Sequence, residues 1–265
     1  MAETVLVTGA SGTLGTKVVE RLRARGYHVR EAGRSGPVRL DLATGEGIPG
    51  AVAGASVIVH AATNPLKDSW KTDVEGTKAL LDAARQASVR HIVYPGIVGT
   101  ERVQGFPYYR VKLAAEAAVK ACGVPWTIQR ATQFFELMPD DFFPLLGRFG
   151  VLIVFRGAKF QPVEVGEVAD RLVDIVGKPP AGMMPDFGGP EVLTMDRMAR
   201  DWKRAAGVRK PVLALPPLVG FIRNWAQGAL LTPEHRDGKT TWSEWLEQRY
   251  GVTRSGVEAS PRPPR

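Results

Sequence analysis

Tyr108 and Lys112 have the residue types and the spacing that acid–base chemistry needs. Positions four apart share one face of a helix, so the two side chains would lie together. A lysine ammonium beside a phenol favours the phenolate and lowers the tyrosine pKa from its ordinary value of about 10. Such a tyrosine exchanges a proton with a carbonyl or alcohol oxygen near neutral pH. The alternative is that Tyr108 packs beneath Pro107 while Lys112 is solvated.

Three glycines indicate a phosphate-binding turn near the start of the chain. The segment TGASGTLG, residues 8–15, places them at the spacing GxxGxxG between an expected strand and an expected helix. Gly9 permits a tight turn, Gly12 lets backbone N–H groups approach a pyrophosphate, and Gly15 lets the helix pack closely on the strand. The alternative is merely a tight turn. The context predicts a dinucleotide held by Gly9, Ser11, Gly12, Thr13, Leu14 and Gly15.

The end of the second expected strand bears on the choice of cofactor. An acidic residue there accepts hydrogen bonds from the ribose hydroxyls of NAD, whereas an arginine accommodates the 2′-phosphate of NADP. Gly33 occupies this position and Arg34 follows it, so NADP(H) is preferred and NAD(H) is possible. Glu31 lies on the same face as Gly33, deeper in the strand, and could compete for the role. Otherwise Arg34 is simply an exposed side chain.

The chain alternates short apolar runs with helical periods, which is typical of right-handed βαβ crossovers. Strands are expected over 4–8, 28–32, 38–40, 57–61, 91–94 and 126–130, and helices over 13–25, 68–84 and 108–121. This rhythm predicts an α/β fold with a doubly wound, Rossmann-like parallel sheet. We expect a dinucleotide-binding core over 1–130 and a smaller, mostly helical C-terminal substrate lobe over 131–252, intertwined with the core. A disordered basic tail is expected over 253–265.

Composition excludes several other classes of protein. The net charge of +8 is scattered, and no helix has a concentrated basic face, so neither nucleic acid nor a membrane is an expected partner. No apolar run is long enough to span a bilayer, and no signal peptide is visible, which predicts a cytoplasmic protein. Cys122 is expected in the core, and His60 and His91 stand without metal-ligand spacing, so no metal is predicted. A small-molecule substrate is expected, with either a monomer or a homodimer.

Taken together, these residues resemble the atypical, NmrA-like branch of the short-chain dehydrogenase/reductase superfamily, in which the glycine turn reads TGxxGxxG. Further segments resemble that family at 41–42, 60–63, 73–77, 108–116 and 130–134. The resemblance implies that Asp41 and Leu42 contact adenine and that Lys112 hydrogen-bonds the nicotinamide ribose. The remaining implied cofactor contacts are Ala61, Ala62 and Thr63.

The family's carbonyl-polarising serine or threonine has no counterpart here, because Gly96 stands at its position. Losing such a donor typically costs on the order of a hundredfold in rate. Either Thr100, Thr132 or Gln133 supplies a donor, or the reaction needs none. We place Gly96, Thr132 and Phe134 near the substrate.

Two functions fit this pattern. The first is an NAD(P)H-dependent oxidoreductase that transfers hydride between NADP(H) and a quinone, a carbonyl or an activated alkene, with Tyr108 and Lys112 as catalytic residues. The second is a non-catalytic redox sensor or regulator of the NmrA type. The presence of both Tyr108 and Lys112 favours the enzyme.

Overall fold

The computed structural model describes residues 3–65, 68–103, 105–218 and 220–251 of the chain. Residue contacts divide it into two compact units. The first comprises residues 1–131 and 165–186, and the second comprises residues 132–164 and 187–265. The predicted tail over 253–265 lies outside the described residues.

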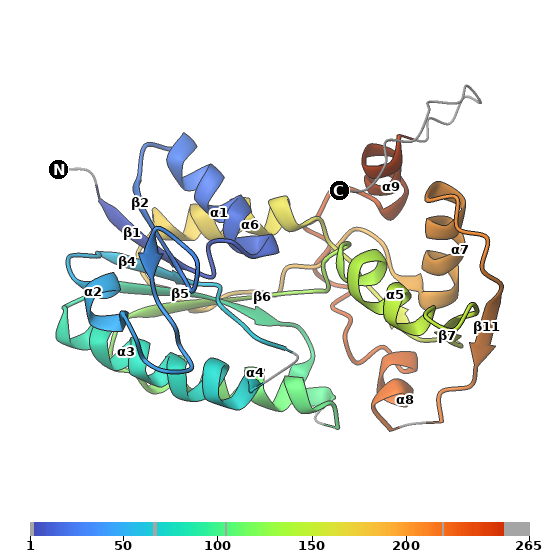
Figure 1. Cartoon of the computed structure of the whole chain (residues 1–265), viewed down its shortest axis with the longest axis horizontal. Helices are drawn as coiled ribbons and strands as arrows, with labels where there is room; N and C mark the ends of the chain where they lie inside the picture. Colours follow the sequence, from blue (N-terminus) through green and yellow to red (C-terminus); the bar gives the residue numbers. More distant parts are fainter. Residues whose placement is uncertain (1–2, 66–67, 104, 219, 252–265) are drawn as a thin grey trace. The chain divides into compact units, whose positions relative to one another are not determined.

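The first unit is built on a seven-stranded parallel sheet in the order β3-β2-β1-β4-β5-β6-β9 (Figure 1). Its strands are β1 (Thr4–Thr8), β2 (His28–Gly33), β3 (Val38–Arg39), β4 (Val57–His60), β5 (His91–Ile97), β6 (Trp126–Ala131) and β9 (Gly182–Met183). Strand order reverses between β1 and β4, and ligands of such sheets bind beyond the carboxyl ends of the strands at this point. The predicted doubly wound fold is confirmed.

Helices cover both faces of this sheet, which is why its central strands are apolar on both sides. In Figure 1, α1 and α6 lie on one face, and α2, α3 and α4 on the other. The helical segments are α1 (Thr13–Ala24), α2 (Ile48–Val52), the π-helix η1 (Lys71–Glu75), α3 (Gly76–Gln86), the 3₁₀ turn η2 (Thr100–Arg102), α4 (Pro107–Ala121) and α6 (Val165–Val176). Leu6, Ile58 and Ile92 are fully buried in the core between the sheet and α3 and α4.

The second unit is smaller and mostly helical. It contains the π-helix η3 (Leu137–Phe142), α5 (Phe143–Leu146), α7 (Met195–Ala205), α8 (Gly220–Ala226) and α9 (Trp242–Tyr250). Two small sheets accompany them: β7 (Leu152–Phe155) pairs in parallel with β11 (Val212–Leu215), and β8 (Lys159–Phe160) pairs antiparallel with β10 (Leu193–Thr194). A capping box between Thr241 and Glu244 begins α9, and its Trp242 and Trp245 rings stack 5.3 Å apart.

The observed division differs from the expected one at residues 165–186, which belong to the first unit. The reason lies in α6, whose apolar face of Val168, Leu172 and Ile175 is buried against the sheet. Arg21 and Arg25 of α1 also form ion pairs of 2.6 Å each with Asp170 and Asp174 of α6. A helix that completes one layer of the sheet therefore returns to the core after the chain has left it.

Candidate functional site

The glycine turn at the end of β1 is shaped by close backbone packing. Gly9 has a φ of 67°, and a Cβ there would lie 2.7 Å from the Cα of Ala62. A Cβ on Gly15 would overlap the carbonyl oxygen of Gly9. Both positions therefore exclude side chains. The turn and the 61–62 segment after β4 adjoin, as the two cofactor-binding segments of the prediction would require.

The beginning of α1 leaves backbone donors open toward solvent. Gly12 is the N-cap residue and has no side chain to cap the helix, and the first helical hydrogen bond runs from the N–H of Thr16 to Gly12. The N–H groups of Thr13, Leu14 and Gly15 therefore have no partner within the helix. Ser11, Gly12 and Thr13 are exposed. Such a helix end binds a pyrophosphate through N–H groups and the helix dipole, so these residues fit a dinucleotide.

Two charged residues near the end of β2, Glu31 and Arg34, are the candidates for binding the ribose or its 2′-phosphate, and their ion pairs differ. Glu31 forms an ion pair with Arg23 of α1, which occupies its carboxylate. Arg34 is exposed, and within the described part of the chain it has no ion-pair partner. A free guanidinium beside an occupied carboxylate suits a 2′-phosphate better than a ribose hydroxyl pair.

The predicted adenine residues lie in a tight turn after β3. The Asp41 carboxylate accepts a hydrogen bond of 2.9 Å from the N–H of Ala43, and Leu42 is buried. A Cβ on Gly76, the first residue of α3, would overlap the carbonyl oxygen of Leu42. Gly76 thus lets α3 approach this turn closely.

His60 connects the first strand to the helix segment behind the site. Its Nδ1 lies 2.7 Å from the Thr8 hydroxyl and its Nε2 lies 2.8 Å from the Thr77 hydroxyl. Since Thr77 donates its proton to the carbonyl of Asp73, Nε2 must donate and Nδ1 must accept. Burial, with a smaller contribution from Lys112, lowers the pKa of His60 to about 3. The imidazole is therefore neutral and structural.

Tyr108 is the outer member of a chain of hydroxyl and carboxylate groups. Its hydroxyl lies 2.7 Å from the Thr63 hydroxyl, which in turn donates to the buried carboxylate of Asp73. The N–H of Asn64 donates to the other carboxylate oxygen at 2.8 Å. Because Thr63 has a single proton, Tyr108 donates its own proton to Thr63. The lone pairs of the Tyr108 oxygen are left to accept a proton from elsewhere.

The electrostatics of Tyr108 correct one expectation. Burial raises the pKa of Tyr108 above its ordinary value, and although Lys112 and Thr63 act to lower the pKa, they do not reverse the shift. The Asp73 carboxylate acts to raise the pKa further. The predicted net lowering by Lys112 was therefore wrong for the chain without a ligand, in which the phenol is protonated at neutral pH.

Lys112 lies on the same helix face as Tyr108, as the spacing predicts. Its ammonium sits 4.5 Å from the centroid of the Tyr94 ring, and its side chain is buried to 8% exposure. Within the described part of the chain, Lys112 has no carboxylate within ion-pair distance. A buried ammonium with an aromatic contact and unused donors is suited to a polar ligand.

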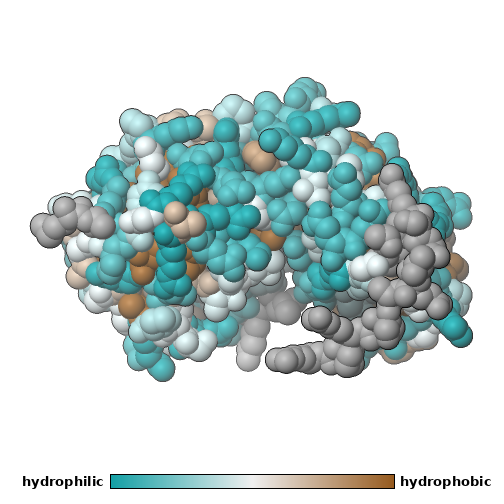
Figure 2. All heavy atoms as spheres, turned by 90° about the horizontal axis from the view of Figure 1, so that it is seen from above, coloured by the Kyte–Doolittle hydropathy of each residue, from teal (hydrophilic) through white to brown (hydrophobic). Residues whose placement is uncertain are grey.

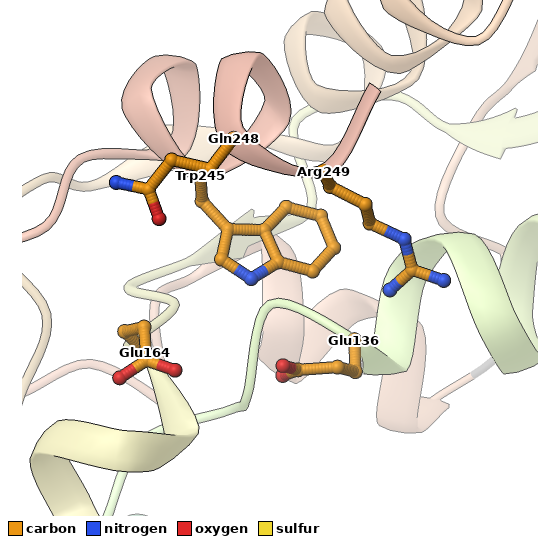
Figure 3. A pocket seen from close by; sticks show the side chains of 5 residues that line it. All are labelled: Glu136, Glu164, Trp245, Gln248 and Arg249. Atoms are coloured by element: carbon orange, nitrogen blue, oxygen red, sulfur yellow. The ribbon is translucent and has the colours of Figure 1, made fainter. Parts of the chain in front are cut away.

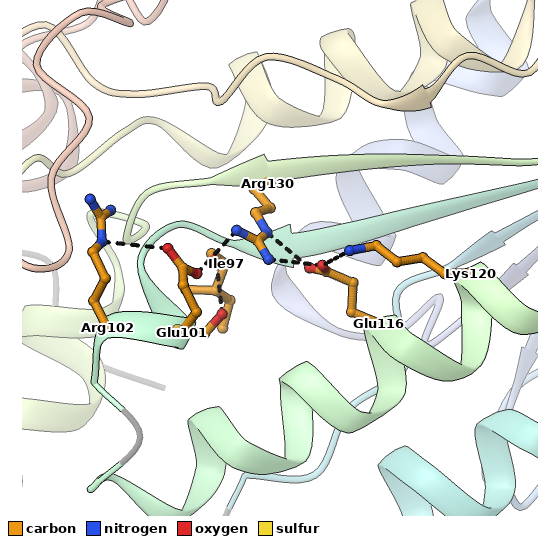
Figure 4. Close-up of polar contacts among 7 residues, drawn as sticks. Ile97, Glu101, Arg102, Glu116, Lys120 and Arg130 are labelled. Atoms are coloured by element: carbon orange, nitrogen blue, oxygen red, sulfur yellow. Dashed lines mark hydrogen bonds and ion pairs between the residues drawn. The ribbon is translucent and has the colours of Figure 1, made fainter.

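A buried ion pair explains why residue 96 is glycine. A Cβ on Gly96 would lie 2.8 Å from Arg130 and 3.2 Å from the Glu116 carboxylate. Figure 4 shows Arg130 reaching from β6 to Glu116 on α4, with Nε and Nη2 donating at 2.9 and 2.8 Å. Lys120 and Glu101 extend the network. The space that a serine would take in the family is thus filled by the pair.

The substitute donors named from the sequence have other partners. The Thr100 hydroxyl donates to the carbonyl of Ile97 and is 1% exposed. In the second unit, the Thr132 hydroxyl accepts from the N–H of Gly189, and Gln133 is buried with its Nε2 directed at the carbonyl of Leu230. Phe134 is half-buried and forms a β-bridge with Val163.

A pocket of the second unit was not indicated by the sequence. Figure 3 shows the Glu136 and Glu164 carboxylates directed toward each other below the indole of Trp245, with Gln248 and Arg249 completing the lining. Burial raises the pKa of Glu136, and Arg249 makes a bidentate ion pair with Asp140. Among the described residues, no cluster of histidine, cysteine and acidic side chains forms a potential metal site.

Sequence reasoning missed the supporting groups of the site. Asp73 and Thr77 occurred in a segment typical of the family but were assigned no contact. The sequence feature that could have identified them is an acidic residue and a hydroxyl residue four positions apart at the beginning of an expected helix. Glu116 and Arg130 carried no such signal, because an ion pair between a helix and a strand cannot be read from spacing.

Comparison with known proteins identifies the first unit. Residues 9–140 match the family described as NAD(P)H-binding. The first unit therefore carries an NAD(P)H-binding domain with a Rossmann-like fold. Its relatives and its fold fit the atypical short-chain dehydrogenase/reductase superfamily, as the resemblance predicted.

Related proteins of this family have different functions. The photosystem II assembly factor Ycf39 of Cyanophora paradoxa is 29% identical over 180 residues, which are 62% of this chain and 54% of that protein. The chloroplastic divinyl chlorophyllide a 8-vinyl-reductase of Oryza sativa subsp. indica is 31% identical over 163 residues, which are 50% of this chain and 40% of the reductase. The chain thus spans about half of the length of such relatives.

Solved structures of dinucleotide-binding proteins share the fold. The NADPH-dependent quinone oxidoreductase of Escherichia coli, complexed with NADPH, has a TM-score of 0.73 at 15% identity, covering 93% of this chain and 99% of that chain. A superfamily protein from Agrobacterium tumefaciens with bound NAD has a TM-score of 0.73 at 19% identity, covering 94% and 96%. The fold is therefore one that holds either dinucleotide.

Proposed function

We propose that the chain is an NADP(H)-dependent oxidoreductase that transfers hydride between the cofactor and a small organic substrate: a quinone, a carbonyl or an activated alkene. The observation that carries the proposal is the cluster of Tyr108, Lys112, Thr63 and Asp73, which lies in the same unit as the glycine turn. Vinyl reductase and quinone oxidoreductase relatives support the reaction class.

Different residues would bind each part of the cofactor and the substrate. The N-terminus of α1 and Arg34 would hold the phosphates, and Asp41 and Leu42 the adenine. Ala61, Ala62 and Thr63 would line the path of the cofactor, and Lys112 would hold the nicotinamide ribose. The bound nicotinamide supplies the hydride. Gly96, Thr132 and Phe134 remain our candidates for the substrate side.

Tyr108 would exchange the proton. Its oxygen can accept a proton from a substrate hydroxyl while its own proton passes to Thr63 and the proton of Thr63 passes to Asp73. Substrate reduction is the reverse: a protonated Asp73 returns the proton through Thr63, and Tyr108 donates to the substrate oxygen. Lys112 stabilises negative charge on the phenol oxygen.

The test is NADPH oxidation in the presence of a panel of quinones, aldehydes and enones. Tyr108→Phe should abolish turnover of a carbonyl and leave NADPH affinity nearly unchanged, because the phenol acts on the substrate rather than on the phosphates. An unchanged rate would rule out Tyr108 as the proton donor and leave direct hydride transfer, as to a quinone.

A second candidate function is a non-catalytic redox sensor. It is favoured by Gly96, whose missing hydroxyl is enforced by the Glu116–Arg130 pair, and by the assembly-factor relatives. A sensor should retain a protein partner differently in its NADPH-bound and NADP-bound forms. Equal retention in a pull-down with both forms, together with turnover of any panel substrate, would eliminate this candidate.

A further inference from the structure

The parallel pair β7 and β11 in the second unit has apolar side chains on both of its faces. Side chains of a strand alternate between faces. Leu152 and Val154 are buried at 1% and 0% exposure, on the face that contacts α7. The opposite face pairs Ile153 with Leu213 and Phe155 with Leu215. Leu213 and Leu215 are 49% and 36% exposed, whereas Ile153 and Phe155 are half-buried, so the described chain covers this face only in part.

Three more exposed apolar side chains belong to the segments that adjoin these strands. Phe149 is 84% exposed, Leu218 is 76% exposed and Leu145 is 62% exposed. The Lys210 ammonium donates to the carbonyl of Gly147 at 2.9 Å, which holds the loop before β7 beside the segment that enters β11. We call the seven residues the β7–β11 face: Leu145, Phe149, Ile153, Phe155, Leu213, Leu215 and Leu218.

Exposed large apolar side chains are concentrated on the β7–β11 face compared with the rest of the described chain. Five of the eight large apolar side chains that are exposed in the described chain belong to the β7–β11 face. The side of the protein drawn in Figure 2 is, by contrast, mainly hydrophilic with small hydrophobic areas. A gathered apolar surface marks an interaction site more often than scattered apolar residues do.

The same segments are uniformly basic. Residues 142–163 and 202–218 contain no aspartate or glutamate, and their cations are Arg148, Arg156, Lys159, Lys203, Arg204, Arg209 and Lys210. None of these forms an ion pair within the described residues, whereas Arg197 and Arg200 nearby in α7 pair with Asp201 and Asp196. Backbone hydrogen bonds join Leu152 to Pro211 and Arg156 to Leu215, so cations stand at both ends of the paired strands.

We propose, contrary to the expectation from the sequence that a membrane is not a partner, that the β7–β11 face docks on the surface of an anionic lipid bilayer. The apolar side chains would enter the boundary between headgroups and acyl chains, and the arginines and lysines would contact lipid phosphates. A second copy of the chain is a poorer partner, because a symmetric contact would oppose the same unpaired cations. No helix in the described part of the chain is long and apolar enough to cross a membrane.

The docking proposal is independent of the proposed catalytic function and is tested without a substrate. The full chain is floated with vesicles of phosphatidylglycerol and phosphatidylcholine, and separately with vesicles of phosphatidylcholine alone. We expect binding to the anionic vesicles that weakens with added salt. Phe149→Ser with Leu213→Ser should lower the bound fraction by about tenfold, and Arg148→Gln with Arg209→Gln should lower it by a similar factor.

Matched controls exchange exposed residues elsewhere. Trp70→Ser replaces an indole that is 52% exposed, and Lys78→Gln replaces an exposed cation of α3. Neither should change vesicle binding. Thermal unfolding checks that each variant is folded. If the double variant Phe149→Ser with Leu213→Ser is not folded, Phe149→Ser alone is used in its place.

Three outcomes would overturn the proposal. The first is the lack of binding to anionic vesicles, and the second is equal binding by the apolar variants and the wild type. The third is a dimer in sedimentation that Phe149→Ser dissociates, since the face would then be an interface between copies. Loss of binding in Arg262→Gln with Arg265→Gln, while the apolar variants still bind, would assign the interaction to the C-terminal basic residues instead.

Discussion

At the scale of single residues, the site depends on which charges are occupied and which are free. Glu31 is held by Arg23, and Glu116 by Arg130, while Arg34 has no ion-pair partner among the described residues. An occupied carboxylate is a poor ligand acceptor, because its existing bond must be broken first. In the function proposed above, the Arg34 guanidinium is therefore the group that would discriminate between the two dinucleotides.

Arg34→Ala should weaken NADPH binding by about tenfold to a hundredfold, since a charged hydrogen bond contributes about 1.5–3 kcal/mol. NADH lacks the 2′-phosphate, so its affinity should stay within about twofold and serves as the internal control. Calorimetric titration with both dinucleotides measures the two effects. A parallel loss for NADPH and NADH would mean that Arg34 does not contact the 2′-phosphate.

The buried pair of Glu116 and Arg130 should contribute strongly to stability. Burial alone would raise the pKa of Glu116, but hydrogen bonds from Arg130 and Lys120 outweigh it and hold the pKa below its ordinary value. Glu116→Gln leaves Arg130 without its bidentate partner, and we expect a loss of about 2–3 kcal/mol in the free energy of unfolding. Urea denaturation at neutral pH measures this loss.

The matched variant is Glu101→Gln, which removes another carboxylate partner of Arg130. Its side chain is 44% exposed, and an exposed pair contributes less than about 1 kcal/mol. The stability that the Glu116 charge contributes should be present above about pH 4.5 and should be lost as the pH falls through the lowered pKa. Equal losses for the two variants would contradict a buried, specific pair.

At the scale of elements, the turn between β1 and α1 was the most predictable part of the chain. Its glycines are required by backbone contacts that any sequence with this strand-turn-helix geometry must satisfy. The central strands β1, β4 and β5 were likewise predicted, because they are buried on both faces and appear as continuous apolar runs. The pair β7 and β11 was not predicted, since two short strands separated by more than fifty residues leave no periodic signal.

Gly15→Ala tests the close packing of α1 on the turn. Its Cβ would overlap the Gly9 carbonyl oxygen, so the first turn of α1 must shift and the phosphate-binding N–H groups move with it. NADPH affinity should fall by at least about tenfold. Gly50→Ala is the control, because Gly50 lies in α2 with open space around it, and alanine there should raise stability by about 0.5–1 kcal/mol. Normal NADPH binding by Gly15→Ala would show that the turn tolerates the shift.

At the scale of the whole molecule, the sequence predicted six of the seven strands of the core sheet, but it predicted neither β9 nor how the chain shares residues between its two units. The return of α6 depends on burial against strands β4, β5 and β6, which precede it by more than thirty residues. The contacts of Gly96 could not be predicted from the sequence either, because Arg130 and Glu116 come from different elements. Local periodicity predicts which segments form helices and strands. Contacts between residues far apart in the sequence are defined only once the sheet has formed.

Two buried histidines make the stability of the first unit sensitive to acid. Burial, with a smaller contribution from a nearby cation in each case, lowers the pKa of His60 to about 3 and the pKa of His91 to about 4. Both side chains are neutral in the folded chain, while in the unfolded chain they gain protons below about pH 6.5. The unfolded state therefore binds more protons between about pH 6.5 and pH 4, and the free energy of unfolding must fall as the pH is lowered through that range.

The expected fall is up to about 1.4 kcal/mol per pH unit for each histidine, measured by urea denaturation at a series of pH values. His91→Gln should reduce this slope, because one of the two groups no longer titrates. Burial raises the pKa of Glu136, so this group makes the free energy of unfolding rise as the pH is lowered. It opposes the histidines, but it is one carboxyl, whereas two imidazoles act in the other direction. A free energy of unfolding that stays constant from about pH 6.5 to pH 5 would mean that the histidines become protonated without unfolding, and that the hydroxyl network around His60 opens to water in the native state.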